Sequence, residues 1–145
     1  MKYQDKFGNK FTGHWVLKPG PEVNSTATTV FMNLPYDTNL HYAEVHLHPF
    51  AESLELKDRT TGKTVFKSFA KNMPDRIGLA QVDYFSSQEG LPLYKDHEYE
   101  LISVYNNTSG QEQDAMAHMV LFVEDKNFVK PLRPRAGDFT NLAGP

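Results

Sequence analysis

The sequence predicts an all-β protein, an antiparallel β-sandwich or jelly roll of about eight to nine strands. Nine Gly and nine Pro interrupt the 145 residues every few positions, and no segment sustains an apolar period of about 3.6 residues over three turns. Short β-branched or aromatic runs followed by turn residues recur instead. That pattern is typical of antiparallel sandwiches.

The expected strands follow one another at short intervals. The first three end at proline-containing turns, where a strand stops because proline cannot donate to the ladder. The fourth alternates in polarity and meets the fifth across Thr60-Thr61-Gly62-Lys63, which predicts a hairpin. Three more strands complete the set. The expected strands cover residues 14–17, 26–32, 41–48, 53–57, 64–67, 77–85, 98–105 and 115–123.

We expect a single domain over residues 1–128 and an irregular C-terminal tail over residues 129–145. The chain has 15 basic and 18 acidic residues, a net charge of −3, and no polybasic patch. This balance argues against a nucleic-acid partner and against binding to a membrane surface. No apolar run approaches the ~20 residues of a membrane-inserted helix. The N-terminal residues lack the apolar stretch of a signal peptide, so the chain is either cytosolic or has lost a signal peptide.

The residues 41–49 carry the most informative functional signal. Residues two apart in a strand point to the same face, so His46 and His48 project their imidazoles side by side, roughly 6–7 Å apart along the backbone. Such a pair chelates metals that favour nitrogen ligands, namely zinc, copper or nickel. Val45 and Leu47 would then face the core. The alternative interpretation is two ordinary surface histidines at the end of a strand.

A second signal lies in residues 114–122. Alternation places Met116 and His118 on one face and Met119 on the other, but the period does not say which face is the core. Methionine in an apolar strand is more often packing than ligand, and Met119 fits that role. Met116 directly follows a polar loop, where a site is easier to build. His118 lies about 7 Å further along the strand and is a candidate fourth ligand or supporting partner.

The two signals together resemble a known family. The motifs His46-Leu47-His48 and, about seventy residues later, Asp114-Ala115-Met116 resemble the C-terminal, oxygen-activating copper domain of the ascorbate-dependent type II copper monooxygenases. Peptidylglycine α-hydroxylating monooxygenase and dopamine β-monooxygenase are familiar members. The similarity runs over about residues 31–123. It implies a β-sandwich on which His46, His48 and Met116 hold one copper ion.

The differences from that family shape the functional expectation. Its complete enzymes carry a second domain with a three-histidine electron-transfer copper, for which 145 residues leave no room. The chain therefore resembles a stand-alone, bacterial-type relative of the copper domain. The absence of cysteine excludes disulfides and thiolate ligands, so soft donors must come from five Met and six His. Two imidazoles and a thioether suit Cu(I) and remain acceptable to Cu(II), whereas zinc rarely takes a thioether.

We therefore expect a periplasmic or secreted copper-binding protein rather than an enzyme. It would hold one mononuclear copper for sequestration, transport or delivery, with a copper-delivery protein as candidate partner. Two alternatives stay open. One is a copper-dependent monooxygenase or oxygen-activating enzyme that uses an external reductant or partner domain, since three ligands leave an open coordination position. The other is a metal-free sandwich that serves as an interaction module.

The remaining histidines are weaker candidates for the site. If residues 98–105 and 115–123 form a hairpin, His97 lies at the end opposite Met116. His41 is about 17 Å of extended strand from His46 and on the opposite face, unless a bulge intervenes. For His14, beside the only tryptophan, the sequence does not decide between the core, an interface and the site.

Overall fold

Two antiparallel sheets of five and four strands form the sandwich that the sequence predicts. The structure is a computed structural model and describes residues 3–4, 10–11 and 13–127. The five-stranded sheet contains, in spatial order, β4 (Gly20–Ala27), β10 (Tyr99–Asn107), β6 (Ala51–Asp58), β7 (Lys63–Asn72) and β8 (Leu79–Val82). The four-stranded sheet contains β3 (His14–Leu17), β11 (Gln113–Val123), β5 (Thr38–Leu47) and β9 (Phe85–Leu93). A separate pair is formed by β1 (Tyr3–Gln4) and β2 (Lys10–Phe11).

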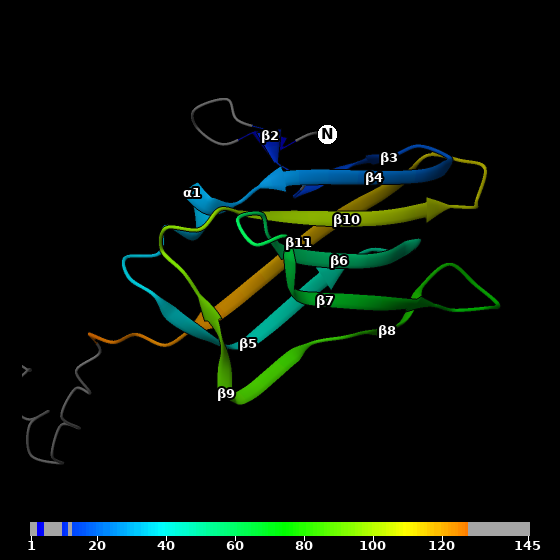
Figure 1. Cartoon of the computed structure of the whole chain (residues 1–145). Coiled ribbons are helices and arrows are strands. Elements are labelled where there is room, and N and C mark those ends of the chain that lie inside the picture. Colours follow the sequence, from blue (N-terminus) through cyan, green and yellow to red (C-terminus); the bar gives the residue numbers. More distant parts are fainter. Residues whose placement is uncertain (1–2, 5–9, 12, 128–145) are drawn as a thin grey trace, which may run out of the picture.

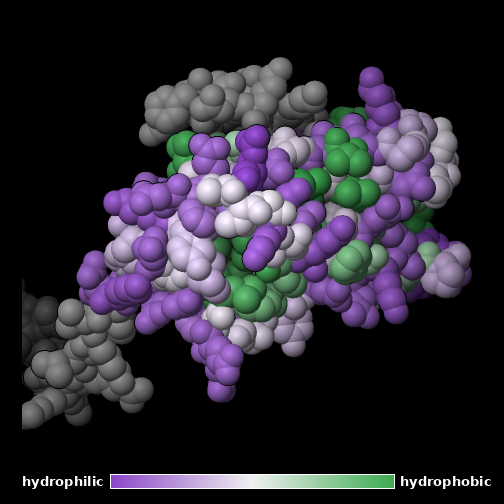
Figure 2. Space-filling model, viewed as in Figure 1, coloured by the Kyte–Doolittle hydropathy of each residue, from purple (hydrophilic) through white to green (hydrophobic). Residues whose placement is uncertain are grey.

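The two layers cross at an angle. In Figure 1, β11 and β5 run diagonally relative to β4, β10 and β6. In the same view hydrophilic side chains cover most of the visible surface, and apolar side chains appear in a few separate places (Figure 2). Such a surface is usual for a sandwich, because alternate residues of each strand face outward.

Inward-facing side chains form two core clusters between the sheets. They confirm that Leu47 and Met119 face the core, as expected. Leu101 and Met119 pack against both clusters. The first core cluster consists of Trp15, Leu17, Leu47, Ala51, Leu54, Tyr105, Ala115 and Ala117. The second core cluster consists of Leu40, Ala43, Leu56, Leu93 and Tyr99.

The predicted hairpin is confirmed, since β6 and β7 pair in antiparallel register. Its turn is closed by Asp58, whose carboxylate accepts the N–H groups of Thr60 and Thr61 at 2.9 and 3.2 Å. Gly62 supplies the left-handed backbone conformation, with φ of 75°. Turn chemistry written in the sequence therefore specifies this element.

The expected strand at 26–32 is wrong beyond Ala27. β4 ends at Ala27, and α1 (Thr29–Met32) is a single helical turn. The N–H of Thr28 donates to the carbonyl of Tyr99 at 2.9 Å, and the Thr28 carbonyl accepts the N–H of Met32. The helix ends at Asn33 with φ of 43°, a conformation that asparagine tolerates. A tertiary contact thus overrides the β propensity of this segment.

The expected strand at 77–85 is divided between the sheets. β8 belongs to the five-stranded sheet and β9 to the four-stranded sheet. The chain crosses at Asp83, whose carbonyl accepts the Ser68 hydroxyl and whose N–H donates to the Phe69 carbonyl. Residues 86–93 of β9 lie outside the expected strands, and this segment contains Gly90 and Pro92, residue types that weaken or interrupt strands.

The hairpin considered for residues 98–105 and 115–123 is absent. β10 and β11 lie in different sheets, so their connection crosses the sandwich. Buried Asn107 fixes this connection, because its amide donates to the carbonyls of Leu17 and Gln111. The expected tail over residues 129–145 lies outside the described residues. In the part of the chain that is described, no helix has the length and apolar character to cross a membrane.

Candidate metal centre

The outward face of the four-stranded sheet carries the candidate ligands. On β11, Ala115 and Ala117 are buried, whereas Met116 is half-buried and His118 is exposed. On β5, Leu47 is buried and His46 is exposed. The structure therefore settles which face is the core, and it leaves the candidate donors on the opposite face, next to solvent.

Strand register arranges these side chains in two rows. His118 pairs with His46 across β11 and β5, and Ala117 pairs with Leu47. Met116 and His48 are each one residue beyond this last pair, and His48 directly follows β5. On its other side Met116 pairs with His14 of β3. His14 and Met116 are thus direct neighbours across one pair of strands, and His118 and His46 across the next.

The imidazole rings lie at spacings that bear on metal binding. With a metal–nitrogen distance of about 2.0 Å, the ring centroids of two imidazoles on one ion are at most about 6.4 Å apart. The centroids of His46 and His48 are 5.4 Å apart, well within this limit. Those of His46 and His118 are 6.3 Å apart, and those of His14 and His48 are 6.4 Å apart, both at the limit.

Three of the rings are held by an oxygen atom at one nitrogen. His48 Nδ1 lies 3.2 Å from the carbonyl oxygen of Asp114, and His14 Nε2 lies 3.2 Å from a carboxylate oxygen of the same residue. His118 bonds to the backbone of Gly13. For the neutral His48 ring, an oxygen that only accepts places the proton on Nδ1, which leaves Nε2 for a ligand. Metal-ligating histidines are usually held in this way.

A buried tyrosine supports the site from beneath. Tyr105 of β10 is 0% exposed, and its hydroxyl crosses the core to donate to the Met116 carbonyl. The same hydroxyl accepts the backbone N–H of His48 at 3.0 Å. Burial raises the pKa of Tyr105 to about 12, although the two backbone contacts lower it. The hydroxyl therefore stays protonated and joins the backbones of two candidate ligands.

Burial and the neighbouring histidines disfavour protonation of His118. Burial and the neighbouring His46 lower the pKa of His118 below its usual 6.5, and His14 and His48 lower it further. The backbone bond to Gly13 acts in the opposite direction. A neutral imidazole is the form that binds a metal ion, so this lowering favours ligation.

The nitrogen and oxygen donors do not by themselves complete a site. Among residues 13–127 and the two short N-terminal strands, no three His, Asp or Glu side chains form a group ready to hold a metal ion. A metal centre here would depend on the thioether of Met116 as well as on imidazoles. No protein-family model, curated protein or solved structure matches this chain. The resemblance to the copper monooxygenase domain therefore stays a prediction.

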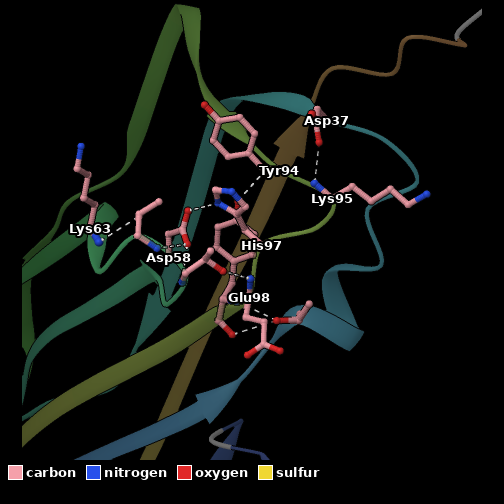
Figure 3. Close-up of polar contacts among 11 residues, drawn as sticks. Asp37, Asp58, Lys63, Tyr94, Lys95, His97 and Glu98 are labelled. Carbon is pink, nitrogen blue, oxygen red and sulfur yellow. Dashed lines mark hydrogen bonds and ion pairs between the residues drawn. The ribbon is translucent and has the colours of Figure 1, made fainter.

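Two other histidines lie away from the candidate ligands. The His41 ring is 3.0 Å from the Ser87 carbonyl on β9, beside a register shift between Leu40 and Tyr42. His97 lies next to Asp58, with His97 Nδ1 2.7 Å from a carboxylate oxygen (Figure 3). Among the described residues, His41 and His97 make no hydrogen bond or ring contact with His46, His48 or His118.

His14 is the histidine for which the sequence decides no role, and the structure places it beside Met116. A single histidine beside a tryptophan carries no periodic signal, and its strand is short. Only the pairing of β3 with β11 brings His14 opposite Met116. To predict that His14 lies beside Met116, one would need the order of the strands in the sheet. That order depends on long-range contacts and not on local sequence.

Proposed function

We propose that this chain is an extracytoplasmic copper-binding protein that holds one copper ion through His46, His48 and Met116. Its role would be to sequester, carry or deliver the ion. One observation carries the proposal. Two imidazoles with ring centroids 5.4 Å apart share a solvent-facing surface with a methionine of the neighbouring strand. A methionine used only for packing would more often face the core, as Met119 does.

The donor chemistry favours copper over zinc. A thioether is a soft ligand that selects Cu(I), while imidazole also suits Cu(II). Bound there, copper would supply a redox-active ion at the protein surface. The protein's own contribution is to keep the rings oriented through Asp114 and the backbone supported through Tyr105.

Delivery to a partner protein is part of the proposal, and the same face of the sheet offers a contact surface. Val120 and Phe122 follow His118 on the outward side of β11 and are both 51% exposed. Phe122 packs edge-on against Tyr42, with ring centroids 5.5 Å apart. The ring centroids of Tyr42 and exposed Tyr84 are 5.9 Å apart. An aromatic surface beside the donors suits a transient protein contact.

The test is a competition titration of the metal-free protein with Cu(I) against a coloured chelator. We expect one tight equivalent, and we expect His46→Ala and Met116→Ala each to weaken it while the circular dichroism spectrum is kept. His41→Ala is the matched control, because His41 lies beside β9. Failure of the wild-type protein to compete, or unchanged affinity in both ligand variants, would contradict the proposed site.

Oxygen activation is the second candidate function, since three protein ligands on an exposed face leave a position open to a small molecule. Reductant-driven oxygen uptake that depends on an added substrate would support it. Copper-loaded protein that consumes no oxygen with reductant and candidate substrates would leave the carrier role as the better proposal.

A further inference from the structure

The turn that follows His48 contains a strained residue. His48, Pro49, Phe50 and Ala51 connect β5 in the four-stranded sheet with β6 in the five-stranded sheet, and the Ala51 N–H donates to the His48 carbonyl at 3.2 Å. Proline in second place and a positive φ in third place are the pattern of a type II turn, whose third residue is usually glycine or asparagine. Here the third residue is Phe50, with φ of 74°. Bulky residues rarely adopt this left-handed conformation, so the turn stores conformational strain.

Two asparagines of the five-stranded sheet hold Phe50 in this conformation. Asn72, at the end of β7, binds the turn twice. Its Oδ1 accepts the Phe50 N–H at 2.7 Å, and its Nδ2 donates to the Ala51 carbonyl at 2.9 Å. The backbone N–H of Asn106 in β10 donates to the Phe50 carbonyl at 2.9 Å. A strained residue persists where its surroundings fix it from several sides, as they do here.

The position of His48 depends on this turn. β5 ends at Leu47, which pairs with Ala117 at the end of the β5–β11 register, so His48 lies beyond the strand pairing. Instead, the Tyr105 hydroxyl accepts the His48 N–H, and the Ala51 N–H binds the His48 carbonyl. The proline that follows restricts the His48 backbone to extended conformations. The turn and Tyr105 together therefore set the direction in which the His48 side chain leaves the sheet.

We propose that Asn72 is a positioning residue of the copper site and acts on His48 through the turn. The inference rests on the proposed function, in which His46 and His48 bind the ion. Contacts from the opposite sheet hold the strain at Phe50, so the fold itself sets the ring centroids of His46 and His48 at 5.4 Å. A ligand that is already held in place loses less conformational entropy on binding, which strengthens metal affinity.

Asn72→Ala and Ser68→Ala form a matched pair for the chelator competition. Both residues lie on β7 and hold a connection between the sheets, since the Ser68 hydroxyl donates to the Asp83 carbonyl between β8 and β9. We expect Asn72→Ala to weaken Cu(I) binding by about tenfold and Ser68→Ala to leave it unchanged. Thermal unfolding of the metal-free variants measures any loss of stability separately. Unchanged affinity in Asn72→Ala, or equal weakening in both variants, would overturn the role of Asn72.

The His48 ring is also followed in the metal-free protein, through long-range proton–nitrogen correlation spectra of ¹⁵N-labelled samples. We expect Asn72→Ala to shift the His48 ring resonances and to leave those of His97 in place, because His97 lies beside Asp58. Unchanged His48 resonances would overturn the positioning role. This measurement needs no copper, so it tests Asn72 even if the wild-type protein fails to bind Cu(I), the result that would overturn the proposed function.

Phe50→Gly keeps the inference testable if Asn72→Ala does not fold. Glycine adopts the left-handed conformation without steric cost and keeps the backbone groups that Asn72 binds, so this variant should keep the wild-type affinity within about twofold. Adding Asn72→Ala to Phe50→Gly removes the two contacts from a turn without strain, and Cu(I) binding should then weaken by about tenfold. Weaker binding in Phe50→Gly alone would assign the positioning to the Phe50 side chain and overturn the role of Asn72.

Discussion

The two ends of β10 carry similar buried tyrosines in different surroundings. Each end carries a buried tyrosine, Tyr105 or Tyr99, whose hydroxyl accepts a backbone N–H. Tyr105 belongs to the first core cluster and supports His48, whereas Tyr99 belongs to the second core cluster and supports Tyr94. The Tyr94 ring in turn lies 4.5 Å from the ring of His97 (Figure 3).

The difference lies in what each end provides for its histidines. His97 meets Asp58, which is 5% exposed and accepts His97 together with two turn N–H groups. On the outer face the only carboxylate paired with a described histidine is that of Asp114, whose side chain is 68% exposed. The buried carboxylate of Asp58 holds His97 in a structural tie, a pair that stabilises the fold. The imidazoles of His46 and His48 contact each other instead, and we propose that they bind a metal ion.

Removing the structural tie is expected to have the largest effect on stability. Asp58→Ala leaves His97 and the N–H groups of Thr60 and Thr61 without their acceptor. We expect a loss of about 3 kcal/mol in the free energy of unfolding, measured by urea denaturation. Cu(I) affinity should stay unchanged, because Asp58 touches none of the candidate ligands. A change in affinity without a change in stability would remove the distinction between the two ends.

Much of the fold was accessible from sequence because its signals are local. Apolar alternation placed most strands, and Thr-Gly turn chemistry placed the β6–β7 hairpin. Sheet membership was not accessible, because it depends on long-range contacts. The division at Asp83 and the helical turn at Thr29 are both set by partners far away in the sequence.

The candidate site shows the same limit. The spacing of His46 and His48 and the position of Met116 are local features, and the structure brings them to one face. His14 arrives from a separate strand, and Tyr105 arrives from the opposite sheet. Neither has a sequence spacing that ties it to the pair of histidines.

Acid should destabilise the Asp58 end selectively. Burial raises the pKa of the Asp58 carboxyl, but the hydrogen bond from His97 and those from Thr61 and Thr60 outweigh it, so the pKa lies below 3.8. The unfolded chain therefore binds the proton more readily, and stability is present above pH 3.8 and lost as the pH falls through the lower, folded-state pKa. Urea midpoints between about pH 5 and about pH 3 should fall more in the wild-type protein than in Asp58→Asn. Parallel decreases in the two proteins would disprove this assignment.

The two tyrosines allow a matched comparison. Tyr105→Phe and Tyr99→Phe each remove one buried hydroxyl, so each should cost about 1–2 kcal/mol of unfolding free energy. Only Tyr105 bonds to the backbones of His48 and Met116. We therefore expect Tyr105→Phe alone to weaken Cu(I) binding, by about tenfold, in the chelator competition. Equal affinities in the two variants would show that the hydroxyl does not position the ligands.

The smallest effect on stability is expected at Asp114, where an exposed carboxylate contacts His14. Asp114→Ala should change the unfolding free energy by no more than about 0.5 kcal/mol, because exposed ion pairs contribute little. Its Cu(I) affinity should stay close to that of the wild-type protein in the chelator competition, because His48 is held by the backbone carbonyl of Asp114, which the substitution keeps. A fall of about tenfold in the affinity of Asp114→Ala would show instead that the carboxylate helps to orient the copper ligands.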